Sequence, residues 1–325
     1  MDGHKDRMKN ALAFIHDTYL ERCDNSGLQK KTWQDTIAVA FPPDLSDGRT
    51  TRPSTRLAGE SGDLGCALLW IVQSALVRPF LGLIRLQADL TPDQMSLLST
   101  FVQTGCGAMA HSEPKEAPVV LTTEPLGLRL NGIKKYITAG SQADFILMSA
   151  RGPGDEKVSR LLLLPVSAIS TGEIIPLDLK ALRTTSHGRL TLENKTVPGH
   201  YLLPLTPPMV RKGLKINGLV ERSLIMEAVL AFMLYLNRRL ARRLSYAPAD
   251  DATIKKLAGQ QTEFATALIH QVRSGATVCP QWVDLNTVST GIESICNATV
   301  DLDPDTNTDL VKRIDDLRFI RSLWG

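Results

Sequence analysis

The stretch GAMAHSEP, from Gly107 to Pro114, separates two kinds of sequence. Before it, residues 1–106 carry apolar side chains at helical spacing, as at Met8 and Leu12. After it come short β-branched or leucine-rich runs bounded by Gly, Pro, Asn and Asp, which are typical of strands. The stretch is itself a small-residue run that ends in a Ser-Glu-Pro turn. Loops of this kind on a rigid scaffold often carry functional sites.

The order of these patterns predicts an α+β multidomain protein with three regions. We expect an N-terminal helical domain at residues 1–106, a middle β-sandwich or barrel at 107–205 and a C-terminal helical bundle at 206–325. The almost wholly apolar run at 65–87, broken by Pro79, predicts a buried helix.

Local signals predict several boundaries within these regions. Residues 41–63 are rich in Pro, Gly, Ser and Asp, which predicts a long loop. Thr91-Pro92 is a helix start, and Asn131-Gly132 lies between alternating residues as in a hairpin turn. Asn217 is placed to cap the first long C-terminal helix.

The composition excludes several classes of protein. The 325 residues are 43% hydrophobic with a formal net charge of +3, and without a long basic run we expect no nucleic-acid partner. The five cysteines are widely spaced without a C-x-x-C pair, so we expect neither a disulfide framework nor a metal site. The first twenty residues carry charges throughout, and no uninterrupted apolar run reaches about 18 residues, so we expect a cytoplasmic protein without a membrane segment.

In this order the motifs resemble those of the acyl-CoA dehydrogenase superfamily of flavoproteins. GAMAHSEP is similar to the family's first flavin loop, which ends in Ser/Thr-Glu-Pro. LNGIKKYITAGSQADFILMSAR, residues 130–151, is similar to the family's "NG-x-K-x-W-I-T-N-G-x-x-A-D" segment and the strand and Ala-Arg that follow it. LKALRTTSHGRLTLENKTVPGHYLL, residues 179–203, is similar to the later strands. The resemblance covers about residues 60–245.

The resemblance implies FAD as cofactor and assigns residues to it. Met109, His111 and Ser112 would line the flavin ring, with the Ser112 hydroxyl bonding its pyrimidine edge. Tyr136 would stack beside the flavin and Thr138 would bond the N5 edge. From the residues alone, these side chains could equally be ordinary strand and turn residues, and His111 an ordinary structural histidine.

The implied chemistry needs a carboxylate that removes a proton next to a thioester carbonyl while hydride leaves the neighbouring carbon for flavin N5. The family's "Y-E-G-T" position is absent here. Isovaleryl- and long-chain-type members place the base early in the first C-terminal helix, before an arginine, and Glu221-Arg222 matches that position. Glu221 is the candidate base, with Arg222 in support. Its alternative role is a first-turn glutamate favoured by the helix dipole after Asn217. Glu227 is the second candidate base.

The sequence also departs from the family pattern. KEAP, residues 115–118, replaces the usual Gly-Ser-Asp loop, and two later segments that contact the adenosine half or a neighbouring subunit's cofactor are missing. The chain therefore looks like a divergent member, shortened by one or two helices in its C-terminal region. These departures concern the pyrophosphate and adenosine contacts more than the flavin edge.

The implied function is FAD-dependent α,β-dehydrogenation of an acyl thioester, carried by CoA or by a carrier protein. The resemblance implies an electron-transferring flavoprotein as acceptor and a homodimer or homotetramer formed through the C-terminal helices. Two alternatives stay open. One is a catalytically degenerate homologue that serves as a subunit or binding partner of an intact dehydrogenase. The other is a flavin oxidase or monooxygenase on the same fold.

Overall fold

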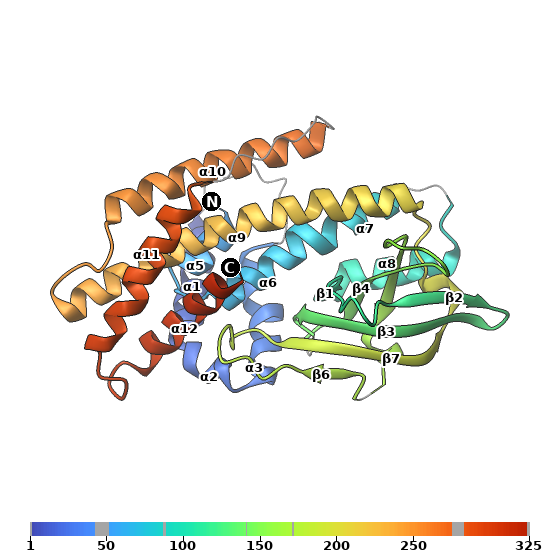
Figure 1. The fold of residues 1–325 in the computed structure, drawn as a ribbon, viewed down its shortest axis with the longest axis horizontal. Coiled ribbons are helices and arrows are strands. Elements are labelled where there is room, and N and C mark those ends of the chain that lie inside the picture. Colours follow the sequence, from blue (N-terminus) through green and yellow to red (C-terminus); the bar gives the residue numbers. More distant parts are fainter. Residues whose placement is uncertain are drawn as a thin grey trace. The chain divides into compact units, whose positions relative to one another are not determined.

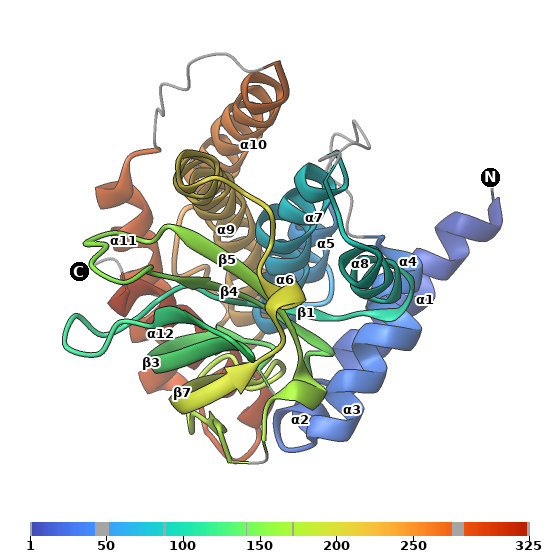
Figure 2. The same ribbon diagram turned by 90° about the vertical axis from the view of Figure 1, so that its right-hand side faces the viewer.

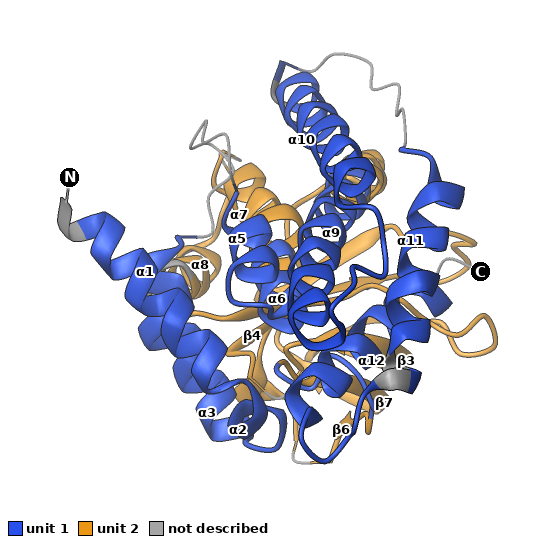
Figure 3. Cartoon of the chain, turned by 90° about the vertical axis from the view of Figure 1, so that its left-hand side faces the viewer, with its two compact units in different colours: residues 1–71, 179–184, 219–325 blue, residues 72–178, 185–218 orange. Residues whose placement is uncertain are grey.

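The structure is a computed structural model that describes residues 2–42, 52–86, 89–140, 142–170, 172–274 and 283–323. Helices come first along the chain, then two sheets, then helices again, which confirms the predicted fold class (Figure 1). The chain forms two compact units, coloured separately in Figure 3. Unit 1 comprises residues 1–71, 179–184 and 219–325, and unit 2 comprises residues 72–178 and 185–218.

Unit 1 is helical. Its N-terminal elements are α1 (Asp2–Asp17), α2 (Tyr19–Cys23), α3 (Ser26–Lys31), the π-helix η1 (Thr32–Ile37), α4 (Ala38–Ala40), α5 (Pro53–Gly59) and α6 (Leu64–Ile71). Its C-terminal elements are the greater part of α9 (Pro207–Leu244), then α10 (Asp251–Ser274), α11 (Leu285–Asn297), the 3-10 helix η5 (Ala298–Asp301) and α12 (Thr308–Ser322).

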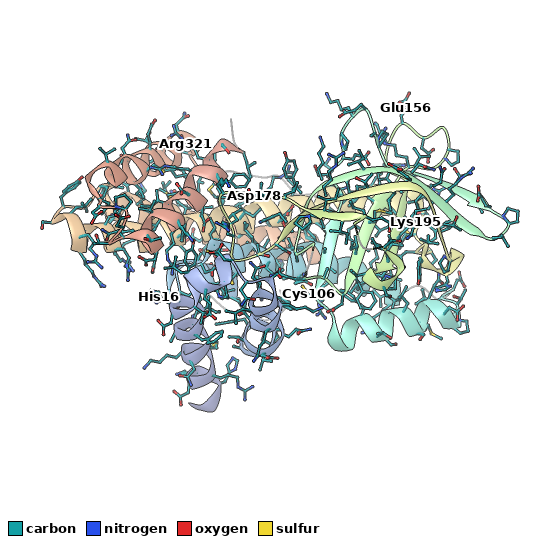
Figure 4. The ribbon with its side chains drawn as sticks, turned by 90° about the horizontal axis from the view of Figure 1, so that it is seen from below. His16, Cys106, Glu156, Asp178, Lys195 and Arg321 are labelled. Atoms are coloured by element: carbon teal, nitrogen blue, oxygen red, sulfur yellow. The ribbon has the colours of Figure 1, made fainter. Side chains whose placement is uncertain are left out.

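The short segment 179–184 belongs to unit 1 although it lies between strands in the sequence. Asp178, labelled in Figure 4, is the last residue before it. The Thr184 hydroxyl donates to Asp63 at 2.6 Å, and the Leu182 N–H donates to Asp316 at 2.5 Å. Both carboxylates are buried, and the fully buried Arg22 lies 2.7 Å from Asp63. Buried polar groups need such partners, so the segment is anchored by two carboxylates of unit 1, Asp63 just before α6 and Asp316 in α12.

Unit 2 contains two sheets, seen as separate layers in Figure 2. The first has the order β1-β4-β5, from β1 (Gly107–Ala110), β4 (Phe145–Ala150) and β5 (Arg160–Pro165). The second has the order β2-β3-β7-β6, from β2 (Val120–Glu124), β3 (Gly127–Thr138), β7 (His187–Val197) and β6 (Ile174–Pro176). Unit 2 also holds the π-helix η2 (Val72–Val77), α7 (Arg78–Arg85), α8 (Pro92–Thr104), and the 3-10 helices η3 (Val166–Ala168) and η4 (Gly199–Tyr201).

The first sheet is covered on both faces, and this explains why β4 is buried along its whole length. Ile146 and Met148 pack into an apolar cluster shared with β2, β3 and β7. Phe145 and Leu147 alternate with them and pack instead with Phe101 of α8 and other helical residues. β4, which pairs with β1 of the GAMAHSEP stretch, therefore lies in a core with no solvent on either face.

Three predicted boundaries are corrected by the structure. Asn131-Gly132 is no hairpin turn, because β3 runs through it and the two-residue turn lies between Glu124 and Gly127. Residues 53–59 of the predicted loop form α5, and residues 43–51 lie outside the described residues. The first long C-terminal helix begins at Pro207, so Asn217 is a buried position inside α9 and not its cap. The start at Thr91-Pro92 is confirmed, with a capping box between Thr91 and Gln94.

The apolar run around Pro79 is helical. The π-helix η2 comes just before α7. Pro79 lies in the first turn of α7, where the missing proline N–H costs the helix little hydrogen bonding. Within the described residues, Leu64–Arg85 is the one helical stretch long and apolar enough to cross a membrane. However, 78% of its most apolar window is buried inside the protein, as in a core helix.

Candidate functional site

The loop after β1 lies against β3, and two backbone hydrogen bonds hold it there. The Lys135 N–H donates to the Ser112 carbonyl at 2.8 Å, and the Ile133 N–H donates to the Ala117 carbonyl at 3.0 Å. Ser112 and Tyr136, both exposed, are thereby brought onto neighbouring segments. Ser112 of the loop and Tyr136 of β3 therefore lie on neighbouring segments of unit 2.

The first strand is fixed in place before the loop begins. The Gly107 N–H donates to the side-chain oxygen of Gln73 at 2.9 Å, and the Gln73 amide also donates to the Gly107 carbonyl. Gln73 lies in the π-helix η2 and is fully buried. The preceding Cys106, labelled in Figure 4, donates its N–H to Asp144 at 2.9 Å. Since β1 is an edge strand of its sheet, these bonds replace the partner strand that it lacks.

Glu113, at the centre of the Ser-Glu-Pro turn, anchors the loop. Lys134 Nζ lies 2.6 Å from one carboxylate oxygen, and the Arg151 guanidinium donates to the other at 2.8 and 3.0 Å. The Val119 N–H adds a fourth bond at 3.2 Å. Burial by itself raises the pKa of Glu113, but the hydrogen bonds and charge of Lys134 and the bond from Arg151 outweigh it, so the pKa is lowered overall. The turn is thus a fixed, ionised anchor.

His111 contacts this network through one ring nitrogen, although the residue as a whole is exposed. Its Nδ1 lies 2.8 Å from the hydroxyl of the buried Ser149 on β4. Burial, followed by the nearby charge of Lys134, lowers the pKa of His111, and Glu113 opposes the change. The ring is therefore neutral near pH 7.

Tyr136 has an unusual backbone for a strand residue. Its φ of 56° is left-handed, and the pairing of β3 with β7 shifts register between Lys134 and Ile137. A bulge of this kind re-aims a side chain, and Tyr136 is 60% exposed. Strained non-glycine residues of this type persist where the surroundings hold them, often at binding sites.

Met109 and Thr138 are less exposed. Met109 packs into the apolar cluster that contains Phe101 and Leu147 and is only 8% exposed. Thr138 is half-buried at the end of β3, directly opposite His187 of β7. The next residue, Ala139, also has a left-handed φ, of 66°, and its N–H donates to the Ser186 carbonyl at 2.7 Å. The chain therefore bends at Thr138.

The loop and β3 residues described above fit the ring of a flavin cofactor better than its phosphates. An exposed aromatic ring, an exposed hydroxyl and an imidazole edge suit a flat ring with a polar rim. After the turn, by contrast, KEAP is a tight connection: the Ala117 N–H donates to the Pro114 carbonyl at 3.3 Å, and β2 begins at Val120. In the described part of the chain, this connection leaves no glycine-rich loop for phosphates.

Glu221 belongs to unit 1 and lies on α9, about four turns after the helix begins at Pro207. The helix dipole acts within the first turn, so it does not explain this residue. Burial raises the pKa of Glu221 to about 7, and the charge of Arg222 only partly opposes it. No described residue forms a hydrogen bond or ion pair with its carboxylate. Arg222 itself points into solvent.

Glu227 is paired, unlike Glu221. Arg52 contacts both of its carboxylate oxygens, at 2.9 and 2.8 Å, and the Thr262 hydroxyl donates at 2.9 Å. Glu227 is 1% exposed, and burial raises its pKa while Arg52 opposes the rise. This is the arrangement of a buried ion pair that joins helices of unit 1, and it leaves the carboxylate little freedom to accept a proton from a substrate.

Lys134, Ser149 and Arg151 were not identified as functional residues from the sequence. All three nevertheless lie within the quoted stretch 130–151: Lys134 is the lysine of the "NG-x-K" segment, Ser149 lies in the following strand, and Arg151 comes directly after it. A buried lysine in a strand needs a carboxylate partner, and Glu113 was the available acid. The contact between Ser149 and His111 gave no signal in the sequence.

No protein-family profile and no curated protein matches this sequence. Solved structures match it over nearly its whole length. A structure described as an acyl-CoA dehydrogenase from Mycobacterium smegmatis has a TM-score of 0.69 at 16% identity, over 98% of this chain and 93% of that chain. The FAD complex of PigA has a TM-score of 0.63 at 14% identity, with 98% and 92% covered. The prolyl acyl carrier protein oxidase AnaB has a TM-score of 0.61 at 16% identity, with 98% and 93% covered. The chain has the acyl-CoA dehydrogenase fold.

Proposed function

We propose that this protein is an FAD-dependent oxidoreductase that removes two hydrogens from the α and β carbons of an acyl thioester, with Glu221 as base. The observation that carries this proposal is the state of the Glu221 carboxylate. The residue is half-buried and has no partner among the described residues, and burial raises its pKa to about 7. A base that works near neutral pH has this property.

The substrate chemistry explains why the pKa matters. A hydrogen next to a thioester carbonyl is only weakly acidic, so the accepting carboxylate must be more basic than a solvated glutamate. Glu221 meets this need through burial on α9, whereas the carboxylate of Glu227 is neutralised by Arg52. Arg222 supports Glu221 by keeping a positive charge nearby, which limits the rise in pKa.

Bound FAD would supply the acceptor for the hydride that leaves the β carbon. In our proposal Ser112 donates to the pyrimidine edge, Tyr136 packs beside the ring, Thr138 donates near N5, and Met109 and His111 line the ring. Support comes from the backbone hydrogen bond that joins Ser112 to β3 and from the strained, exposed Tyr136. The similar PigA was solved as an FAD complex.

The acyl group would be carried by CoA or by a carrier protein. The similar AnaB is a prolyl acyl carrier protein oxidase, and the similar M. smegmatis structure is described as an acyl-CoA dehydrogenase. We expect a cytoplasmic homodimer or homotetramer that passes electrons to an electron-transferring flavoprotein.

The proposal is tested by product analysis. Purified protein with FAD is incubated with a panel of acyl-CoA and acyl carrier protein thioesters, and the products are weighed by mass spectrometry. We expect a product two hydrogens lighter with the unaltered protein and with Glu263→Gln, an exposed glutamate on α10. Glu221→Gln should give none. Turnover retained by Glu221→Gln would remove Glu221 as base. Stoichiometric hydrogen peroxide in air would instead identify an oxidase on this fold.

A second candidate function is a catalytically degenerate subunit that partners an intact dehydrogenase. The observation in its favour is the tight KEAP connection, which leads directly from Pro114 to β2. Without a phosphate loop, FAD would bind weakly or only in a mixed assembly. This reading predicts a colourless protein that co-purifies with a homologous flavoprotein. Turnover by the protein alone would exclude it.

A further inference from the structure

A chain of polar contacts runs behind the GAMAHSEP loop and ends at His111. Arg151 holds Glu113, Glu113 holds Lys134 at 2.6 Å, Lys134 contacts the Ser149 hydroxyl at 3.2 Å, and Ser149 contacts His111 Nδ1 at 2.8 Å. Lys134 and Ser149 are both fully buried. All five residues belong to unit 2. The assignment of donors and acceptors along this series of contacts determines which ring nitrogen of His111 carries the hydrogen.

The Lys134 ammonium uses all of its hydrogens. It has three donors and no acceptor, and three oxygens lie around it: a carboxylate oxygen of Glu113 at 2.6 Å, the Ser149 hydroxyl at 3.2 Å and the His111 carbonyl at 3.3 Å. The short contact to a carboxylate keeps the lysine charged, although burial lowers its pKa. The Ser149 oxygen is therefore an acceptor toward Lys134.

The hydroxyl hydrogen of Ser149 then needs an acceptor. Among the described residues, His111 Nδ1 is the acceptor left within reach of this fully buried hydroxyl. A buried donor without a partner is costly, so Ser149 donates to Nδ1. Nδ1 must then carry no hydrogen, and the neutral imidazole carries its hydrogen on Nε2. His111 is an exposed residue, and no described residue forms a hydrogen bond with Nε2, so the Nε2–H is a donor available to a ligand.

The charges that face His111 favour the same neutral form. Lys134 approaches from β3 and disfavours a second positive charge, and Glu113 of the loop opposes it but is itself shared with Arg151. Ser149 faces the ring from β4 and is uncharged. Protonation would also place an N–H at Nδ1, and Ser149 would have to give up its donor role.

We propose that Ser149 and Lys134 hold His111 as the neutral Nε2–H tautomer, and that this N–H donates a hydrogen bond to an acceptor atom on the rim of the bound flavin. The second half of this inference rests on the proposed flavin function, and the first half does not. His111 contacts the cofactor, whereas Ser149 and Lys134 act through it as positioning residues. The flavin would thereby receive a neutral donor that stays the same across the physiological pH range.

The tautomer is tested on the protein without flavin, by nitrogen-15 NMR of the histidine rings. The chain has six histidines, and His111→Leu identifies the signals of His111. We expect hydrogen on Nε2 and an unprotonated Nδ1, with a titration midpoint below the usual value of about 6.5. Ser149→Ala should move the Nδ1 resonance, because that nitrogen loses its donor. Lys134→Met should raise the midpoint toward about 6.5.

The matched control is Ser159→Ala. Ser159 is another buried serine of unit 2, and it bonds Asp155 and Gly152 rather than the histidine. It should leave all His111 signals unchanged. Hydrogen on Nδ1 in the unaltered protein, or an Nδ1 resonance unmoved by Ser149→Ala, would overturn the inference.

The flavin half is tested by adding FAD. We expect the Nε2–H resonance of His111 to shift on binding, and His111→Leu to weaken FAD binding about two- to tenfold, the worth of one neutral hydrogen bond. FAD binding that leaves this resonance unchanged would overturn this half alone. Complete absence of FAD binding would overturn both the proposed function and this half, and the tautomer measured without flavin would still be decided separately.

Discussion

At the residue scale, two glutamates of α9 have very different surroundings. Glu221 is half-buried and has no partner among the described residues, whereas Glu227 is fully buried with Arg52 and Thr262 around it. Burial raises the pKa of both, but only the first carboxylate is free to exchange a proton with a substrate. The family resemblance ranked Glu221 ahead of Glu227, but the sequence could not show that Glu227 is paired, because Arg52 lies 175 positions away in the chain.

The pKa of Glu221 predicts how activity depends on pH. The base works in its deprotonated form, so kcat/KM should rise about tenfold per pH unit below about pH 7 and level off above it. The measurement is kcat/KM of the FAD-loaded protein across this range, with a substrate that has no titrating group there. A profile without a midpoint near 7 would argue against Glu221 as base.

The same pKa predicts a stability difference between the unaltered protein and Glu221→Gln. The folded pKa of about 7 exceeds the ordinary value of 4.5, so the folded state binds the proton more tightly than the unfolded state does. Stability contributed by Glu221 is present below about pH 4.5 and is lost as pH rises through about 7. The free energy of unfolding of Glu221→Gln, measured relative to that of the unaltered protein, should therefore be higher at pH 8 than at acid pH by on the order of 1–3 kcal/mol. Denaturant unfolding at both pH values measures the difference, and an equal difference at the two would contradict it.

Glu227→Gln should lower the stability of the protein, whereas Glu221→Gln should raise it at pH 8. Removing the charge leaves the buried Arg52 guanidinium without its carboxylate, so the free energy of unfolding should fall by about 3–5 kcal/mol. Glu60→Gln is the matched control in the same unit, because Glu60 forms an exposed pair with Arg56 and should lose less than about 1 kcal/mol. Equal losses in the two variants would show that Glu227 is not held as the structure describes.

At the scale of elements, the bulged strand β3 shapes the candidate flavin surface. It carries Gly132, where the chain has a φ of 129°, and Tyr136, where it has a φ of 56°. Asn-Gly is typical of a hairpin turn, and the sequence predicted one there. The strand instead continues, because it pairs with β2 on one side and with β7 on the other. Tertiary pairing thus overrides the local turn preference.

Gly132→Ala tests this explanation. A Cβ at residue 132 would lie 2.3 Å from the Pro118 carbonyl oxygen, and the backbone conformation itself disfavours a side chain. We expect a loss of more than about 2 kcal/mol in the free energy of unfolding. Gly154→Ala is the control, because its φ is also positive, at 76°, but its Cβ would meet open space. It should lose only about 1 kcal/mol. A milder effect at Gly132 than at Gly154 would refute the close approach of KEAP to β3.

The start of α9 shows what local sequence signals can and cannot decide. Thr91-Pro92 correctly predicted a helix start, and Thr206-Pro207 is the same signal: the Val210 N–H donates to the Thr206 carbonyl at 3.0 Å. The prediction of Asn217 as the cap is wrong, because Asn217 is buried inside the helix. The corrected start moves Glu221 out of the first turn, so the helix dipole no longer accounts for its presence.

At the scale of the whole molecule, the sequence order of helices, strands and helices predicted the fold correctly. The motifs predicted the loop residues Met109, His111 and Ser112 and the strand residues Tyr136 and Thr138 as flavin contacts. All five lie in unit 2, and their contact with a flavin stays a prediction. What the sequence could not supply were contacts between distant positions: Ser149 with His111, Lys134 with Glu113, and Gln73 with Gly107. The division into domains at residues 106 and 205 stays a prediction.

The most direct test of the central claim is the visible absorbance of the purified protein with added FAD, followed while an acyl thioester is mixed in without oxygen. The account predicts a protein-bound flavin band that bleaches with the unaltered protein and with Glu263→Gln, and that binds but does not bleach with Glu221→Gln. A protein that cannot be loaded with FAD, or a Glu221→Gln protein that bleaches at the unaltered rate, would contradict it.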